Sequence, residues 1–300
     1  MEIYERIYNE LKHERSGLWY ISDEYGSKIM LKVPSNVARS LIHGCGIAFL
    51  FGKDTKLVPP ILHIGVRIYD DPVHFISISQ TNRFKDEHRS LKRIMELKNV
   101  VMQVYTELNA CVATVNVAIE EQEATRVLQL MGNIEDLYVG EFGQTATESL
   151  KCFDFTFDPS RKLPGVHEIE KEVIGCTLSD FRIIESRFVG ANEVGRISIA
   201  NKNEGEIFEQ QGWTPLQSLF DFDIYRNPKV AEKNGYRELT DILAFSEYGI
   251  FLVETKAIAI LNLEKERNME RKVASVQKQI LKAIDQLKGA AKNIQEGVEI

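Results

Sequence analysis

The chain has 300 residues, a hydrophobic content of 44%, a charged content of 27% and a formal net charge of −7. This length is comfortable for two domains, and the composition is that of a folded globular protein rather than a disordered one. The acidic balance excludes a protein that coats nucleic acid with its whole surface, so any contact with phosphates must be local.

The sequence offers no segment that would direct the chain to a membrane. The longest apolar runs, such as 47–51 and 250–253, fall far short of the roughly 20 residues that cross a bilayer. The N-terminal stretch MEIYERIYNELKHE carries acidic residues and helical periodicity, where a secretory signal has a basic start and an unbroken apolar stretch. A cytoplasmic protein without membrane contact is therefore expected.

The first 160 residues alternate between helix-like and strand-like patterns. Helices are predicted over the first dozen residues and over about 85–98 and 120–131, where apolar residues recur on one face. Strands are predicted at LWYIS, KIMLKV, GIAFLF, ILHIGVRIY and HFISIS, and through Val115 and Val117. This order of elements is typical of an α+β domain.

Cysteine and histidine spacing gives no sign of a metal site or a disulfide framework. The four cysteines are widely scattered, with no CxxC motif and no neighbouring histidine at zinc-ligand distance, and are interpreted as buried thiols. The six histidines all lie before residue 170 without i, i+4 pairs, so structural roles are expected. Asp70 and Asp71, followed by Pro72, are interpreted as a turn rather than a metal site.

The stretch DPSRKLPG, residues 158–165, gathers proline, glycine and charge as linkers do. It sets the predicted boundary between an α+β domain at 1–160 and a second domain at 161–300. In the second domain, strands are predicted at FRIIESRFV and GRISIA, followed by a short helix over NEGEIFEQQ. A half-buried strand is predicted over SLFDFDIY, where Asp221 and Asp223 alternate with apolar residues.

The stretches LTDILAF and GIFLVETKAIAI, joined by SEYG, are predicted to form a β-hairpin. If Glu247 and Tyr248 occupy its tip, paired residue numbers sum to 495, and Asp241 lies opposite Glu254. Side chains alternate along a strand, so Glu254 and Lys256 point to the same face. Burial of these charges at the end of an apolar strand requires compensation, which Mg²⁺ or Mn²⁺ would supply. The alternative is a network that only fixes the strand register.

This arrangement, Asp241 followed after twelve residues by Glu254-Thr255-Lys256, resembles the PD-(D/E)xK nuclease superfamily. Within it, RELTDILAFSEYGIFLVETK is similar to the restriction-endonuclease-like and nuclease-related (NERD-like) branches, over roughly residues 203–294. The resemblance implies an α/β domain with a mixed central sheet that hydrolyses phosphodiester bonds with Mg²⁺ or Mn²⁺. It makes Asp241 and Glu254 metal ligands, with Lys256 activating water or stabilising charge.

A long helix predicted at about 268–294 adds candidates for the same site. Its apolar residues recur with a 3.6-residue period, so this face should pack on the sheet. Lys272, Gln279 and Gln286 recur every seven residues along one flank, and the resemblance makes Gln279 a candidate orienting residue. Between Lys265 and Lys292, eight basic residues stand against three acids, which fits either a phosphate-contacting face or an ordinary charged exterior.

The resemblance also implies an acidic ligand from the helix that precedes the hairpin. Glu206 is the preferred third metal ligand and Glu209 the other candidate, whereas Glu238 should point to the opposite face if its strand is regular. In the resembling fold a further strand follows the long helix, yet this chain stops six residues beyond Ile294. Either the strands between about 170 and 200 complete the sheet, or the core is reduced.

The sequence thus predicts a metal-dependent endonuclease. DNA is the expected substrate because the superfamily mostly cuts DNA, and RNA fits the same residues. The resemblance further implies a bacterial-type nuclease with a role in restriction, antiviral defence or DNA repair. The first 160 residues could recognise a target, form a homo-oligomer or bind a regulatory protein partner. The alternative is a module that binds nucleic acid or protein and keeps the nuclease fold without turnover.

Overall fold

The computed structural model describes residues 3–24, 26–69, 75–160, 163–189, 194–201, 203–220, 223–232, 235–256 and 269–298. The chain divides into two compact units, Met1–Ile184 (unit 1) and Glu185–Ile300 (unit 2). The predicted boundary at residue 160 lies earlier, because strands that follow the predicted linker join the sheets of unit 1. The predicted turn at Asp70-Asp71-Pro72 lies outside the described residues. No described helix has the length and apolar character needed to span a membrane.

Unit 1 contains two sheets. One has the strand order β1 (Gly17–Asp23), β2 (Gly26–Lys32), β6 (Asn99–Tyr105), β7 (Cys111–Ala118), β9 (Thr177–Ile183). It is mixed, because β2 and β6 run parallel and the other neighbours run antiparallel. The other is antiparallel, with the order β5 (Phe75–Asn82), β4 (Ile61–Tyr69), β3 (Gly46–Asp54), β8 (Glu170–Gly175). The consecutive strands β8 and β9 therefore link the two sheets.

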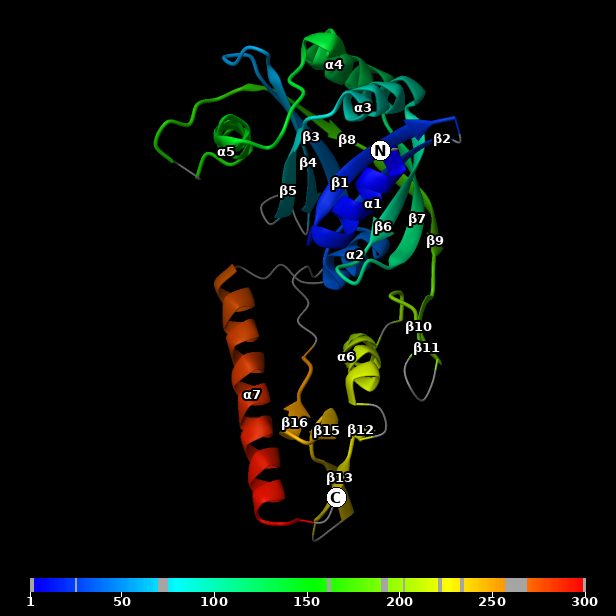
Figure 1. Ribbon diagram of the computed structural model, residues 1–300, viewed down its shortest axis with the longest axis vertical. Coiled ribbons are helices and arrows are strands. Elements are labelled where there is room, and N and C mark those ends of the chain that lie inside the picture. Colours follow the sequence, from blue (N-terminus) through cyan, green and yellow to red (C-terminus); the bar gives the residue numbers. More distant parts are fainter. Residues whose placement is uncertain are drawn as a thin grey trace. The chain divides into compact units, whose positions relative to one another are not determined.

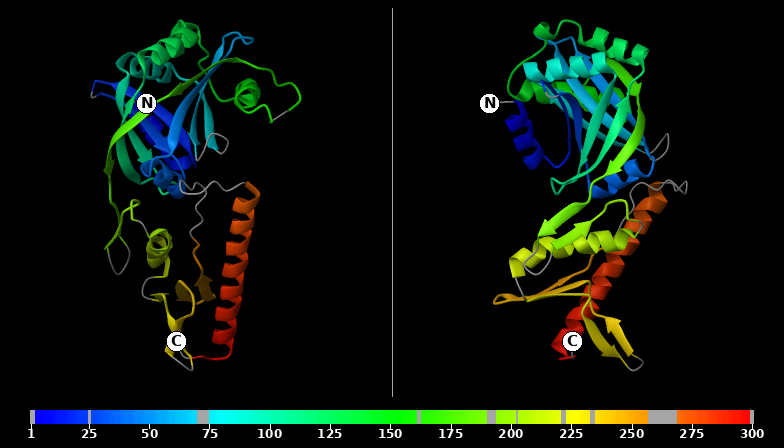
Figure 2. Two further views of the ribbon diagram at one scale, coloured as in Figure 1. Left: turned by 180° about the vertical axis from the view of Figure 1, so that it is seen from behind. Right: turned by 90° about the vertical axis from the view of Figure 1, so that its right-hand side faces the viewer.

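The helices of unit 1 lie outside its strands (Figure 1 and Figure 2). α1 (Ile3–His13) buries Ile7 and Leu11 against Trp19 and Ile21 of β1. α5 (Gln144–Phe157) packs on β3, β4 and β5. The remaining helices are α2 (Ser35–Ile42), α3 (Lys85–Leu97), α4 (Glu121–Met131) and the 3-10 helix η1 (Ile134–Asp136).

Alternation along β3 separates the core of unit 1 from the layer beneath α5. Tyr20 of β1 lies near Phe49 of β3, with ring centroids 6.4 Å apart, and both side chains are buried. Because successive side chains of a strand point to opposite faces, Gly52 and Asp54 face α5 instead. A Cβ added at Gly52 would lie 2.6 Å from Cδ2 of Phe153, so α5 approaches the strand closely there.

Unit 2 is built on an antiparallel sheet with the order β12 (Ile224–Arg226), β15 (Ile242–Ser246), β16 (Gly249–Val253). α6 (Glu204–Phe220) packs Trp213 against Ile242 and Ala244, whereas α7 (Met269–Gln295) packs Ala290 against Leu243. A helix thus covers each face of the sheet. The described part of unit 2 also contains two short hairpins, β10 (Ser186–Val189) with β11 (Val194–Ile197) and β13 (Lys229–Glu232) with β14 (Gly235–Glu238).

Two sequence predictions about the sheet of unit 2 need correction, and one of the two alternatives for completing the sheet is excluded. The strand predicted over SLFDFDIY is wrong at its start, because α6 continues to Phe220 and β12 begins at Ile224. Trp213, Leu216 and Phe220 recur at helical spacing and pack on one sheet face, which favours the helix. The strands at 170–183 do not complete this sheet, since they pair within unit 1. The mixed sheet likewise belongs to unit 1, and the described strands of the unit 2 sheet are antiparallel.

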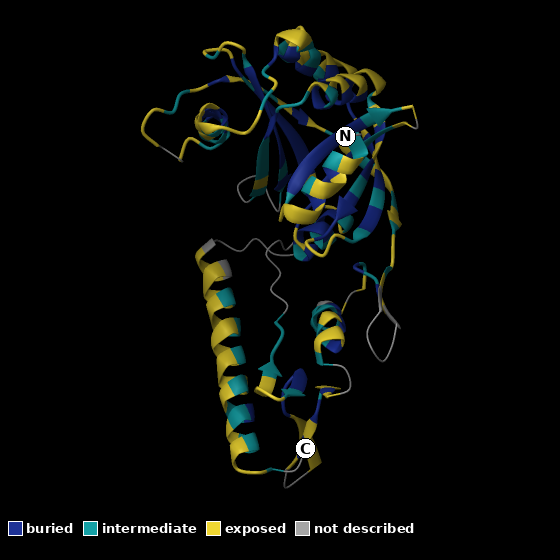
Figure 3. Ribbon diagram, viewed as in Figure 1, coloured by how far each residue is buried: buried dark blue, intermediate teal, exposed yellow. Residues whose placement is uncertain are grey.

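The predicted long helix is confirmed as α7, but only its C-terminal part packs closely on the sheet. Ala290 is buried, and Ile294 joins the same apolar cluster. Val273, Ile280 and Ile284, which belong to the predicted apolar stripe, are exposed. Figure 3 shows α7 as a helix of mainly exposed and half-buried residues.

Candidate functional site

The hairpin of β15 and β16 carries the predicted site. A two-residue tip joins the strands, and pairing extends to Ile242 opposite Val253. These residue numbers sum to 495, so the predicted register is confirmed. Asp241 and Glu254 come next on either side, just beyond the end of the ladder. Both residues therefore lie where backbone pairing stops, and no described hydrogen bond joins their carboxylates directly.

Asp241 is buried, and its carboxylate is held by the opposite side of the hairpin. Its Oδ2 accepts hydrogen bonds from the backbone nitrogen of Thr255 at 2.5 Å and from the Thr255 hydroxyl at 2.7 Å. Its backbone oxygen accepts from the nitrogen of Asn227 at 2.8 Å. Two short donors fix the orientation of the carboxylate and partly compensate its charge.

Glu254 and Lys256, which alternation places on the same face, form an ion pair. Oε1 of Glu254 accepts from the Lys256 ammonium, and Oε2 lies 3.5 Å from the hydroxyl of Thr240. The Glu254 side chain is 2% exposed, whereas that of Lys256 is 22% exposed. The carboxylate is therefore covered, and the ammonium is within reach of solvent.

A third carboxylate, that of Glu238, interacts with those of Asp241 and Glu254. Burial, a hydrogen bond to Asp241 and the charges of Asp241, Glu209 and Glu254 raise the pKa of Glu238 above its ordinary value. The prediction that Glu238 points to the opposite face required a regular strand at this residue, and this condition is not met. The reason is local, because β14 ends at Glu238 and the chain is irregular until β15 begins at Ile242.

On α6, the acid that acts on this cluster is Glu209. It lies 3.5 Å from the guanidinium of Arg226 and contributes to the raised pKa of Glu238. Glu206 lies one turn earlier, where its carboxylate accepts from the side-chain amide of Asn203 at 3.4 Å. Within the described residues no contact joins Glu206 to Asp241, so its role as third metal ligand stays a prediction.

α7 carries Gln279 and Gln286, two of the three residues predicted to recur along one flank of this helix. Gln279 is half-buried, and its catalytic role stays a prediction, since no described contact joins it to Glu254. Gln286 lines an open groove of about 700 Å³ on the same helix. The charged residues that line this groove are Arg237, Lys278, Lys282 and Asp285. The surface is locally basic within an acidic protein.

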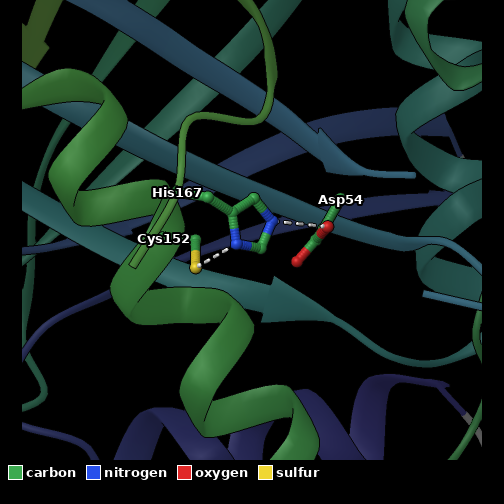
Figure 4. Close-up of side chains that lie close together, drawn as sticks. All are labelled: Asp54, Cys152 and His167. Atoms are coloured by element: carbon green, nitrogen blue, oxygen red, sulfur yellow. Dashed lines mark hydrogen bonds and ion pairs between the residues drawn. The ribbon is translucent and has the colours of Figure 1, made fainter. Parts of the chain in front are cut away.

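Unit 1 contains a second polar cluster, formed by Asp54, Cys152 and His167 (Figure 4). Nδ1 of His167 lies 3.4 Å from Sγ of Cys152, and Nε2 lies 3.1 Å from Oδ1 of Asp54. The prediction of buried thiols holds for Cys152 and Cys45, whereas Cys111 and Cys176 are half-buried. The spacing of cysteines and histidines in the sequence gives no sign of this contact between Cys152 and His167.

No spacing rule finds this cluster in the sequence. Cys152 and His167 are 15 residues apart, and Asp54 is 113 residues from His167. They meet because α5 packs on β3, where Asp54 is the last residue. The cluster can therefore be recognised only from the three-dimensional structure.

Comparison with protein-family models, with curated proteins and with solved structures finds no match to the chain. The α+β architecture with a mixed sheet is observed directly.

Proposed function

We propose that unit 2 is a metal-dependent nuclease with Asp241, Glu254 and Lys256 at its centre. The observation that supports this most is the end of the apolar hairpin, where Asp241 and Glu254 follow the last ladder pair, Glu238 bonds to Asp241, and the charge of Glu209 acts on Glu238. Two basic groups near them, Lys256 and Arg226, leave an excess of negative charge. A divalent cation is the ordinary means of neutralising such an excess.

The donor set fits Mg²⁺ or Mn²⁺, because every candidate ligand is a carboxylate oxygen. Asp241 and Glu254 would hold the ion, and Glu238 or Glu209 is better placed than Glu206 to add a third oxygen. When bound, the ion would polarise the scissile phosphate and lower the pKa of the attacking water.

The chain itself supplies positioning and one positive charge. Thr255 holds Oδ2 of Asp241 with its backbone nitrogen and its hydroxyl, and Glu238 also bonds to the Asp241 carboxylate. Glu254 holds Lys256 through Oε1, and among the described residues its Oε2 has a single long contact, to the hydroxyl of Thr240 at 3.5 Å, which suits this oxygen for a metal ligand. The partly exposed ammonium of Lys256 can stabilise charge on a phosphate or orient water.

DNA remains the preferred substrate, with RNA as the alternative. The groove on α7 that Lys278, Lys282 and Arg237 line offers cations to a phosphate backbone. The sheet of unit 2, covered by α6 and α7, is compatible with a reduced restriction-endonuclease-like core. Restriction or antiviral defence would use this activity, with unit 1 recognising a target or a protein partner.

A module that binds without turnover is the second candidate, and one observation favours it. Asp241 and Glu254 are each satisfied by protein donors, Thr255 and Lys256. Within the described part of unit 2, no three ligand atoms form a ready-made metal set. A network that is complete without a cation could serve structure alone.

The test is cleavage of plasmid, linear and single-stranded DNA and of RNA by the full chain with Mg²⁺ or Mn²⁺. Glu254→Gln and Lys256→Ala should each lower the cleavage rate about 100-fold or more. Glu247→Gln is the matched control, because it changes an exposed glutamate at the tip of the same hairpin. Cleavage that survives both site substitutions would contradict the proposed site.

A measurement of metal binding distinguishes the nuclease from the module that binds without turnover. The nuclease proposal requires Mg²⁺ or Mn²⁺ to raise the melting temperature, with a smaller gain in Asp241→Asn. Glu238→Gln should raise the metal-free melting temperature at neutral pH, because it removes repulsion from Asp241. Absence of both cleavage and metal stabilisation would favour the binding module.

A further inference from the structure

The cluster of Asp54, Cys152 and His167 in unit 1 is independent of the nuclease proposal and is arranged as a relay. His167 lies between the other two side chains, with Nδ1 facing Sγ of Cys152 and Nε2 facing a carboxylate oxygen of Asp54 (Figure 4). A metal ion would need one ring nitrogen directed, with the sulfur and the oxygen, at a single point. The two nitrogens instead serve two different partners, so the observed orientation suits proton transfer rather than chelation.

The carboxylate of the relay is firmly held. Asp54 is buried at the end of β3, where Oδ2 accepts from the hydroxyl of Ser149 at 2.8 Å and Oδ1 accepts from the backbone nitrogen of Lys56 at 3.2 Å. Ser149 also contacts His63 at 2.7 Å, and burial lowers the pKa of His63 to about 4, so that ring is neutral. Among the described side chains that contact Asp54, His167 is the one that can bring it positive charge.

The position of the Asp54 carboxylate determines the tautomer of His167 and therefore which ring nitrogen can accept the thiol proton. A carboxylate accepts the proton on Nε2, which leaves the lone pair of Nδ1 directed at Cys152. Transfer of the thiol proton to Nδ1 then gives a thiolate beside an imidazolium that Asp54 stabilises. The thiolate is the nucleophilic form of cysteine.

The low solvent exposure of Cys152 limits which molecules can react with its sulfur. Cys152 is 4% exposed and packs in an apolar cluster with Leu50, Phe153 and Ile169. The His167 side chain is 27% exposed, so the relay meets solvent on one side. A peptide or ester could not bring its carbonyl carbon to so deeply covered a sulfur, whereas a molecule as small as hydrogen peroxide could.

We propose that Cys152 is a hydroperoxide-reactive thiol, with His167 as its base and Asp54 as a positioning residue. The thiol proton passes to Nδ1 of His167, and the thiolate attacks the terminal oxygen of the peroxide. The S–O bond forms as the O–O bond breaks, and two electrons pass from sulfur to the peroxide. The leaving hydroxide or alkoxide takes the proton from His167, which gives a Cys152 sulfenic acid and water or an alcohol.

The experiment treats the full chain with limiting hydrogen peroxide, traps sulfenic acid with dimedone and quantifies each cysteine by mass spectrometry. Cys45 is the internal control, because its exposed fraction is also 4%. Cys152 should be labelled at least about tenfold faster than Cys45, since a positioned base contributes this much or more. His167→Gln should remove the difference, and Asp54→Asn should reduce it.

His167→Gln is the decisive variant, because its partly exposed side chain can change without opening the core. Its fold is checked by circular dichroism and by the urea midpoint, so the test stands even if Asp54→Asn fails to fold. Equal labelling of Cys152 and Cys45, or unchanged labelling in folded His167→Gln, would overturn the proposal. Stoichiometric zinc in the purified protein that is lost in Cys152→Ser would also overturn it, in favour of a metal site.

Discussion

Thr255→Val measures how much the hairpin network depends on a charged hydrogen bond. The substitution removes the hydroxyl that donates to Oδ2 of Asp241 at 2.7 Å, while shape and the backbone donor are kept. A hydrogen bond to a charged group contributes about 1.5–3 kcal/mol, and Asp241 is 6% exposed, so a loss of about 2 kcal/mol is expected. In a unit the size of Glu185–Ile300, this corresponds to a fall in melting temperature of about 8 °C.

Urea unfolding followed by Trp213 fluorescence measures this loss. The chain has two tryptophans, so a Trp19→Phe background leaves Trp213, which packs beside the hairpin, as the reporter of unit 2. Thr214→Val is the matched control, because its buried hydroxyl donates to the neutral carbonyl of Gln210 at 2.8 Å. Its loss should cost about 1 kcal/mol or less.

The comparison between these two variants decides whether Asp241 is held as a buried anion. A loss in Thr255→Val about twice that in Thr214→Val supports the charged network. Equal losses would refute the reasoning, because the hydroxyl of Thr255 would then be worth no more than a donor to a neutral carbonyl. In that case the compensation argument for a cation at Asp241 would fail as well.

Two further predictions concern unit 1. Gly52→Ala would place a methyl group 2.6 Å from Phe153 and 2.8 Å from Ile169, so overpacking should cost about 1–3 kcal/mol in urea unfolding followed by circular dichroism. An unchanged midpoint would contradict the close approach of α5 to β3. Because burial lowers the pKa of His63 from 6.5 to about 4, the unfolded chain binds more protons between these values. Stability should therefore fall by roughly 3 kcal/mol as pH drops through this window, and His63→Gln should flatten the dependence; an unaltered slope in that variant would rule the assignment out.

Local signals account for what the sequence predicts correctly in unit 2. The two-residue tip fixes the hairpin register, so Ile242 pairs with Val253 without any tertiary information. The position of Glu238 depends instead on how the chain turns between β14 and β15. Glu209 reaches the cluster only through the packing of α6 on the sheet. Spacing in the sequence therefore cannot show that Glu238 and Glu209, among the acids of unit 2, belong to the cluster of Asp241 and Glu254.

Unit 1 shows where periodicity fails. The strands at 46–54 and 61–69 follow from long apolar runs, but α5 and β6 were not predicted. The buried side of α5 includes Ser149 and Thr156 among its apolar residues, which weakens the helical pattern. Because the polar Ser149 supports Asp54 in the relay, the feature that hides the helix from the sequence is part of the site.

Both clusters place an acid at the end of an apolar strand, and the physical reason is the same. Beyond the last ladder pair, backbone N–H groups have no strand partner, and Lys56 and Thr255 donate theirs to Asp54 and Asp241. The adjoining sheet face excludes water, so the carboxylate charge is weakly screened and interacts strongly with its neighbours. The backbone donors offset part of the free energy that burial of this charge costs. An acid at such a position can fix the proton of a neighbouring imidazole, as at His167, or attract a cation, as proposed at Asp241. The group that lies beside the strand end therefore decides which chemistry follows.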